Sequence, residues 1–414
     1  MLSNFFSKNK LFKSKSSKGD AAISESSQAS SISEPAINES HSETEGKKVI
    51  KRFLIAYRSV TFPLGFLCVT ASCDIQISKK EYVISALLPF PCDGELHELE
   101  DKLTDLVHKK VSFSVEYQVV PVRQHSIKGI KNIIAVSSGK GGVGKSTTAV
   151  NLAYGLIAEG CNVGILDADI YGPSIPTLLG LKGEKPTSHD GKLMNPLESD
   201  GLSAMSIGFL VDDANATVWR GPMASRAFSQ LLNETDWPEL DYLIVDMPPG
   251  TGDIQLTLAQ QVPVAGALVI TTPQDIALVD AVKGISMFEQ VQLPVLGIIE
   301  NMSYHQCESC GHHSSLFGTG GGERVANTAK TPLLGQLPLD IRIREDADRG
   351  CSFITKDSAG ELAHLYRKIA RHVAAQLYYQ LDMRSPTTAE LIMPELKSST
   401  ANKSSAADLF SEAK

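Results

Sequence analysis

The chain has 414 residues, of which 42% are hydrophobic and 21% are charged. This composition is typical of a globular protein, and the length allows two or three domains at roughly 100–200 residues each. The formal net charge of −8 excludes a general attraction of the whole molecule to nucleic acid or anionic lipid. No apolar run reaches the ~18 residues that a membrane-spanning helix needs.

Seven cysteines are present and most of them are scattered, a pattern that argues against the disulfide scaffold of a secreted protein. The N-terminus lacks the long apolar core and the small-residue cleavage site of a secretory signal. We therefore expect a cytoplasmic protein in a reducing compartment.

Residues 1–48 are rich in Ser, Lys and Glu and contain few large apolar side chains. Such a segment cannot bury enough surface to offset its ordering entropy, which predicts a disordered tail. The first 19 residues carry five lysines and no acid, with Phe and Leu between them. A helix that touches a membrane or serves in targeting is the alternative interpretation.

Residues 49–126 predict a small α+β domain. Two extended runs within 66–90 are separated by a polar turn, and an apolar stripe at 95–109 predicts a helix. Residues 111–119 alternate strictly between apolar and polar side chains, as a half-buried strand does. The order strand–strand–helix–strand suffices for one small sheet with a helix packed on it.

Residues 127–382 change character, because near-continuous apolar runs alternate with helical stretches and Gly-rich turns. This pattern predicts an α/β domain with a doubly wound, mostly parallel sheet. The strands that we expect are 132–137, 163–167, 241–246, 265–271, 295–300 and 333–337.

A long helix is expected near the end of this domain, and residues 383–414 are polar and predict a flexible tail. The helix has an apolar stripe that favours core packing over a partner-binding or membrane-binding face. The stripe consists of Leu362, Leu365, Ile369, Val373 and Leu377.

Residues 139–147 form a Gly-rich turn between an apolar strand and a helix predicted at about 146–159. Glycines allow successive backbone N–H groups to point at an anion, and the helix dipole favours a phosphate there. A match with a strand before it and a helix after it predicts the phosphate site of a P-loop ATPase. The candidate residues are Gly139, Lys140, Gly141, Gly142, Val143, Gly144, Lys145, Ser146 and Thr147.

Individual roles follow from the side-chain chemistry. Lys145 is expected to reach the β- and γ-phosphates, and the Ser146 hydroxyl to ligate Mg²⁺. Asp246 ends an apolar strand, where a carboxylate that holds Mg²⁺ through water belongs. Asp167 and Asp169 follow another strand, and each is a candidate to orient the attacking water or the water shell of the metal. Capping a helix or solvating a loop is the alternative for these two residues.

Lys140 is a second lysine inside the turn. It is either a solvated loop charge or a lysine that reaches a nucleotide in a neighbouring subunit. The Gly-rich run at 247–253, which follows Asp246, could change shape when the γ-phosphate leaves.

Cys307 and Cys310 form a Cys-x-x-Cys motif followed by Gly311, His312 and His313. A disulfide and a thioredoxin-like redox pair are both disfavoured, the first by the reducing compartment and the second by the Gly- and His-rich run. Zinc could use both cysteines and one of the histidines. An iron–sulfur cluster often requires four thiolates, which a symmetric dimer would supply. The spacing alone leaves zinc and iron–sulfur equally favoured, and the other five cysteines are expected to be small buried hydrophobic residues.

The turn at 140–147 resembles the deviant Walker A motif of the nitrogenase-iron-protein, septum-site and partition ATPase group. Within that group, further motifs over about residues 127–380 are similar to the Mrp (ApbC) family of iron–sulfur cluster carriers. These motifs are Asp167-Ala-Asp-Ile-Tyr-Gly-Pro-Ser174, Trp219-Arg-Gly-Pro-Met223, Asp246-Met-Pro-Pro-Gly-Thr-Gly-Asp253, and Asn301-Met302 followed by Cys307-x-x-Cys310.

The resemblance implies a homodimer that hydrolyses ATP slowly and delivers a labile [4Fe–4S] cluster to apo-proteins, with other cluster carriers as further candidate partners. It makes Cys307 and Cys310 the cluster ligands and Lys140 the intermolecular lysine. It also suggests that Asn301 contacts the adenine. Residues 49–126 carry no clear copy of the acidic, Gly-containing motif and Cys of the family's N-terminal domain, so we interpret them as a degenerate version of it.

Two other functions compete with a cluster carrier. A positioning or partition ATPase would act on DNA or a membrane, but the C-terminal tail is polar and nearly balanced in charge, which argues against the membrane version. We therefore expect no stable membrane association, and the net charge of −8 leads us to expect no nucleic-acid partner. An ATPase with a structural zinc at the cysteine pair is the other alternative.

Overall fold

A computed structural model describes residues 43–78, 80–188, 191–211 and 221–381. The predictions for residues 1–42 and 383–414 lie outside the described residues. The first described helix, α1 (Glu43–Ala56), begins inside the range predicted as a tail. It forms because Ile50 and Leu54 are fully buried in the core. None of the described helices combines the length and apolar character that crossing a bilayer requires.

The N-terminal part of the described chain folds around a three-stranded sheet in which β2 is central. β1 pairs with β2 antiparallel, whereas β3 pairs with it in parallel, so α3 provides the crossover between β2 and β3. A short helix occupies the start of the run predicted as extended at 66–90. The elements are α1, α2 (Phe66–Val69), β1 (Ser72–Ile77), β2 (Glu81–Leu88), α3 (Asp93–Val107) and β3 (Lys110–Tyr117).

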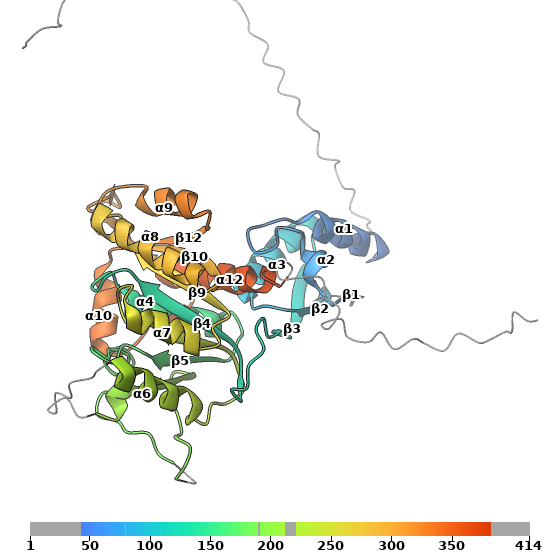
Figure 1. Cartoon of the computed structure of the whole chain (residues 1–414). Helices are drawn as coiled ribbons and strands as arrows, with labels where there is room; N and C mark the ends of the chain where they lie inside the picture. Colours follow the sequence, from blue (N-terminus) through green and yellow to red (C-terminus); the bar gives the residue numbers. More distant parts are fainter. Residues whose placement is uncertain (1–42, 79, 189–190, 212–220, 382–414) are drawn as a thin grey trace, which may run out of the picture. The chain divides into compact units, whose positions relative to one another are not determined.

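The larger sheet is doubly wound and mostly parallel, as the sequence predicts (Figure 1). Among the described residues, seven strands run parallel in the order β7-β5-β8-β4-β9-β10-β12. The short strands β6 and β11 add antiparallel partners to β7 and β10. The strands are β4 (Ile130–Ser138), β5 (Val163–Asp167), β6 (Leu197–Ser199), β7 (Leu202–Ser206), β8 (Leu240–Asp246), β9 (Gly266–Thr271), β10 (Val295–Gln306), β11 (His313–Ser314) and β12 (Leu333–Pro338).

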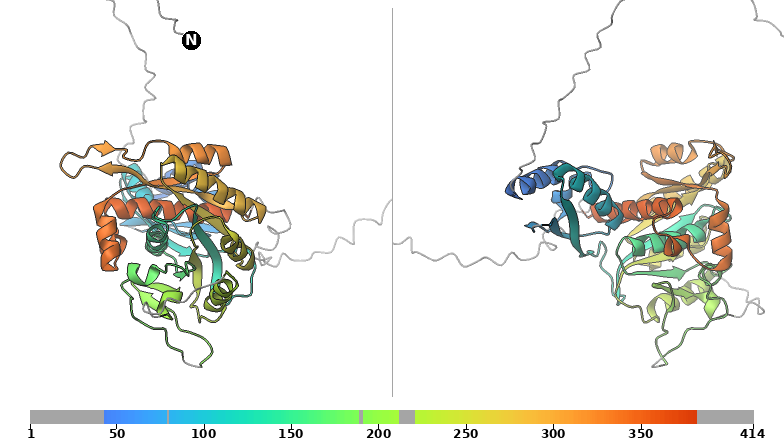
Figure 2. Two further views of the ribbon diagram at one scale, coloured as in Figure 1. Left: turned by 60° about the vertical axis from the view of Figure 1, so that its left-hand side comes forward. Right: turned by 180° about the vertical axis from the view of Figure 1, so that it is seen from behind.

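Helices cover both faces of this sheet (Figures 1 and 2). α8 and α9 pack on one face against β9 and β10, while α4 and α12 pack together on the other. The helices are α4 (Lys145–Ala158), α5 (Ile175–Leu178), α6 (Gly221–Asn233), α7 (Asp253–Gln261), α8 (Asp275–Gln290), α9 (Gly321–Ala329), α10 (Ile341–Arg349), α11 (Phe353–Lys356) and α12 (Glu361–Tyr379), with a 3₁₀ turn at Ile207–Phe209.

All six strands expected in this domain are confirmed to within a few residues. β10 is the exception in length, because it continues from the predicted end at residue 300 to Gln306. The apolar stripe of the C-terminal helix is also confirmed as a core face, since Ile369, Val373 and Leu377 are buried.

The sheet order places the functional residues together. β4 lies between β8 and β9, and β8 lies between β4 and β5. In the parallel register, Asp246 at the end of β8 pairs with Asp167 at the end of β5 and with Val136 of β4. The carboxyl ends of these strands therefore meet where the chain order reverses, which is the usual binding position in doubly wound sheets.

Candidate nucleotide site and cysteine turn

The Gly-rich turn connects β4 to α4 as predicted, and α4 begins at Lys145. Gly142 and Gly144 both have φ near +83°, a backbone conformation that favours glycine. A Cβ on Gly144 would lie 2.3 Å from Nδ2 of Asn301, and one on Gly139 would lie 2.4 Å from the backbone of Asp280. These close approaches explain why the turn needs glycine at both positions.

Lys145 lies inside the protein, with only 6% of its surface exposed. Its Nζ is 2.5 Å from Oδ1 of Asp246, 3.2 Å from Oγ of Ser146 and 3.9 Å from Oδ2 of Asp169. The structure therefore brings these four predicted residues into one cluster at the start of α4.

Asp167 and Asp246 are both fully buried, side by side. Burial, followed by the neighbouring Asp246 carboxylate, raises the pKa of Asp167 to about 7. Burial also raises the pKa of Asp246, against the opposing effect of the Lys145 ammonium. Perturbed carboxyl groups of this kind cluster at functional sites.

The two carboxyl groups differ in how their oxygens are satisfied. Oδ1 of Asp167 accepts from the Asp169 N–H at 3.0 Å, and its Oδ2 accepts from the Ser206 hydroxyl at 3.0 Å. By contrast, Oδ2 of Asp246 is buried and has no hydrogen-bond partner among the described residues. A buried oxygen without a donor is costly, so Asp246 is the carboxylate that is ready to take a further ligand.

Lys140 and Asn301 flank the turn in different ways. Lys140 is half-buried, and its Nζ lies 3.5 Å from Oε1 of Gln274. Asn301 is buried, and its Nδ2 donates to the carbonyl of Val143 inside the turn at 2.9 Å. Its suggested contact with adenine stays a prediction, whereas its hold on the turn is a finding that sequence reasoning missed.

Cys307 follows β10 directly and stands in a tight turn that leads to β11. The Cys307 N–H donates to the His312 carbonyl at 2.9 Å, and the Gly311 N–H donates to the Cys307 carbonyl at 2.8 Å. Hydrogen bonds from the backbone N–H groups of Ser309 and Cys310 lower the pKa of Cys307. A cysteine that the turn stabilises as a thiolate is a good ligand for a soft metal centre.

The histidines do not complete a zinc site in one chain. His313 stacks on Tyr304 with ring centroids 4.7 Å apart, and no three His, Cys, Asp or Glu side chains gather into a metal-binding group within the described ranges. Cys307 is half-buried and Cys310 is exposed. The pair is therefore accessible to ligands from outside the chain.

The expectation for the other five cysteines is confirmed only in part. Cys92 and Cys161 are buried, but Cys68 and Cys73 are exposed and Cys351 is half-buried. Cys68 lies in the short helix α2, and Cys73 lies near the start of the edge strand β1.

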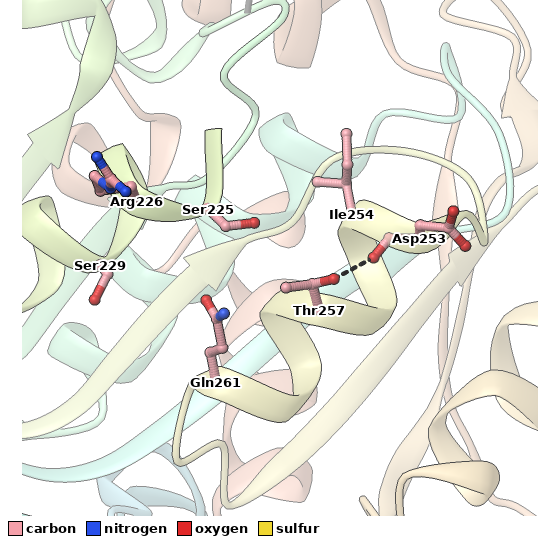
Figure 3. A pocket seen from close by; sticks show the side chains of 7 residues that line it. All are labelled: Ser225, Arg226, Ser229, Asp253, Ile254, Thr257 and Gln261. Atoms are coloured by element: carbon pink, nitrogen blue, oxygen red, sulfur yellow. Dashed lines mark hydrogen bonds between the residues drawn. The ribbon is translucent and has the colours of Figure 1, made fainter. Parts of the chain in front are cut away.

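A surface cavity of about 830 Å³ lies between α6 and α7. Figure 3 shows the two helices facing each other across it, and the Thr257 hydroxyl donates to the carbonyl of Asp253 at 2.7 Å. The lining residues are Ser225, Arg226, Ser229, Asp253, Ile254, Thr257 and Gln261. No residue of the Gly-rich turn lines this cavity, so it is not the phosphate site.

The family model for NUBPL iron-transfer P-loop NTPases (ParA) matches residues 129–374, more than half of the chain. The chain belongs to this family. Among relatives of this iron-transfer P-loop NTPase, the iron–sulfur cluster carrier protein of Escherichia coli K12 is 56% identical over 306 residues, which cover 72% of this chain and 83% of that protein. The iron–sulfur cluster transfer protein NUBPL of Mus musculus is 48% identical over 257 residues, covering 62% and 80% of the two chains.

Solved structures similar to the NTPase include a nucleotide-binding protein in complex with ADP from Archaeoglobus fulgidus. It is 40% identical and covers 54% of this chain and 87% of that one, with a TM-score of 0.48. The cell division ATPase MinD of Pyrococcus furiosus is 22% identical and covers 58% and 98% of the two chains, with a TM-score of 0.44.

Proposed function

We propose that this protein is an ATP-dependent carrier of a [4Fe–4S] cluster. It binds and slowly hydrolyses ATP at the Gly-rich turn, holds the cluster between two copies of the chain, and passes it to apo-proteins. The observation that carries the proposal is the exposed Cys307–Cys310 turn, which stabilises a thiolate and stands at the end of the strand that also holds the nucleotide turn. The iron–sulfur cluster carrier of E. coli and the cluster transfer protein of M. musculus, both similar to this chain, support the same class of cargo.

The nucleotide half of the proposal assigns a role to each residue of the buried cluster. When ATP binds, the Lys145 ammonium leaves the Asp246 carboxylate and contacts the β- and γ-phosphates. The backbone N–H groups of the turn surround these phosphates. The free Oδ2 of Asp246 and the Ser146 hydroxyl fit Mg²⁺, which prefers hard oxygen ligands, and the ion would neutralise phosphate charge. Asp167 and Asp169 orient water at this end of the sheet.

The cluster half of the proposal requires a second subunit. One chain supplies two thiols in an exposed turn, whereas a [4Fe–4S] cluster is usually held by four. A two-fold axis beside Cys307 and Cys310 supplies the other two, since a symmetric interface presents the same surface twice. In such a dimer Lys140 reaches the nucleotide of the other subunit.

Anaerobic reconstitution of the full chain with iron and sulfide tests the proposal. We expect about four iron and four sulfide per dimer, with the visible absorption of an iron–sulfur cluster. Cys307→Ala should remove the cluster and leave ATP affinity unchanged. Cys73→Ala, which alters an exposed cysteine in the small sheet, is the matched control and should keep the cluster. Zinc without sulfide, a permanent monomer, or a full cluster in Cys307→Ala would overturn it.

A further inference from the structure

The middle of β10 contains a bulge that no sequence pattern predicts. Glu300 pairs with Gln336 of β12, and the next paired residue, Tyr304, pairs with Pro338. Three residues of β10 therefore face one residue of β12. Met302, inside this segment, has φ of +56°, which is unusual for a residue with a side chain. Bulges of this kind are often found beside functional sites, where they redirect side chains.

The side chain of Glu300 holds the bulge in place. It is 1% exposed, and its Oε1 accepts from Nε2 of Gln336 at 2.9 Å and from the hydroxyl of Ser303 at 2.8 Å. Its Oε2 accepts from the Gly322 N–H at the start of α9. The carboxylate thus ties the bulge to β12 on one side and to α9 on the other.

The bulge lies between the two halves of the proposed machinery. Asn301, the residue after Glu300, donates to the carbonyl of Val143 in the nucleotide turn at 2.9 Å. From Tyr304 the strand continues to Gln306 and ends at Cys307. A single strand therefore connects the nucleotide turn to the cysteine turn, and the bulge on this path is fixed by a buried carboxylate.

We propose that Glu300 is a positioning residue that transmits nucleotide binding from the Gly-rich turn to the cysteine turn. The inference rests on the proposed function. A ligand that moves the carbonyl of Val143 also moves Asn301. Because Glu300 fixes the bulge to β12 and α9, the displacement passes along β10 toward Cys307. When these bonds are lost, the bulge absorbs the displacement. Energetic coupling between two sites can be carried by packed and hydrogen-bonded elements of this kind.

The test compares Glu300→Gln with Glu323→Gln, a matched change of an exposed glutamate on α9. Reconstituted dimers are mixed with an iron(II) chelator, and the rate of cluster loss is measured with and without Mg²⁺ and a non-hydrolysable ATP analogue. We expect the nucleotide to change this rate about fivefold or more in the wild type and in Glu323→Gln. In Glu300→Gln the ratio of the two rates should approach one, although cluster content and ATP affinity remain those of the wild type.

Each outcome decides the matter. A wild-type protein that takes up no cluster overturns the proposed function and the inference with it. A wild-type cluster whose loss does not respond to nucleotide overturns the inference alone, as does a Glu300→Gln protein with the wild-type ratio. If Glu300→Gln does not fold, Ser303→Ala replaces it, because it removes one donor from the same carboxylate. A wild-type ratio in Ser303→Ala would then refute the role of the bulge.

Discussion

The nucleotide turn and the cysteine turn differ most in burial. Lys145 and Asp246 are buried and bonded to each other within one chain, and Asp167 is buried beside them. The cysteine turn instead exposes Cys310 and half-exposes Cys307. The first site has nearly all its polar groups fixed in advance, which is how proteins stabilise charge that develops during phosphoryl transfer. The second site leaves both thiols accessible, as the proposed loading and release of a cluster require.

The largest expected effect separates the two sites. Lys145→Ala removes the buried ammonium at the phosphates, and we expect the rate of ATP hydrolysis to fall about 10²–10³-fold. The cluster content after reconstitution should not change, because the bonding partners of Lys145 in the described part of the chain are Ser146, Asp169 and Asp246 and include no cysteine. Hydrolysis and iron and sulfide counts are measured on protein shown to be folded by circular dichroism.

Lys128→Ala is the control for this variant, since Lys128 is exposed ahead of β4. Loss of the cluster in Lys145→Ala as well would contradict the prediction that cluster binding does not depend on Lys145.

An intermediate effect is expected from the backbone of the nucleotide turn. In Gly144→Ala the new Cβ would lie 2.3 Å from Nδ2 of Asn301, at a residue whose φ is +83°. We therefore expect the Kd for ATP to rise about tenfold, equivalent to ~1.4 kcal/mol. Gly183→Ala has a φ of +89° and no atom within 4 Å of the new Cβ. It suffers the same backbone strain, about 1–2 kcal/mol, without disturbing the turn.

Calorimetric titration of both proteins with ATP measures this difference. Equal affinities would mean that the contact between Gly144 and Asn301 does not shape the nucleotide site.

The smallest expected effect concerns the scaffold that both sites share. His372 of α12 is 9% exposed, with Nδ1 3.4 Å from the carbonyl of Leu334 in β12. Burial lowers the pKa of His372 below its usual value near 6.5. As the pH falls, His372 is therefore protonated in the unfolded chain before it is protonated in the folded one. The free energy of unfolding decreases as the pH falls below about 6.5.

The free energy of unfolding is measured by urea titration at pH 7.5 and at pH 5.5. Between these two values it should fall less in His372→Gln than in the wild type. The sign of the difference follows from the lowered pKa of His372, which makes protonation favour the unfolded chain. His364→Gln, which changes an exposed histidine on the same helix, is the matched control. A pH dependence in His372→Gln equal to that of the wild type would contradict the assignment.

The parts of the fold that could be predicted are those with local signals. The parallel strands were visible as apolar runs, and the Gly-rich turn was visible because a strand precedes it and a helix follows it. β10 was predicted to end at residue 300 because the sequence turns polar there. It continues because Glu300 finds distant donors, Gln336 and Gly322, that no local pattern reveals.

The candidate site was predictable to the same extent. The types of residue that cradle phosphate and bind soft metals are readable from spacing alone. The choice between zinc and an iron–sulfur cluster could not be made from the sequence, because two cysteines at this spacing suit both. The stacking of His313 on Tyr304 depends on the fold and was not visible in the sequence either. The exposure of Cys68 in α2 and of Cys73 in β1 was likewise hidden, since it depends on how these elements pack in three dimensions.

The bond between Lys145 and Asp246 has a consequence for selectivity. Each charge neutralises the other in the closed interior, so a lone anion must compete with a carboxylate and a lone cation with an ammonium. A ligand that delivers a polyphosphate and a divalent ion together replaces both partners in a single exchange and leaves neither charge stranded. We therefore expect the Lys145–Asp246 pair to disfavour free anions and free cations and to favour their complex.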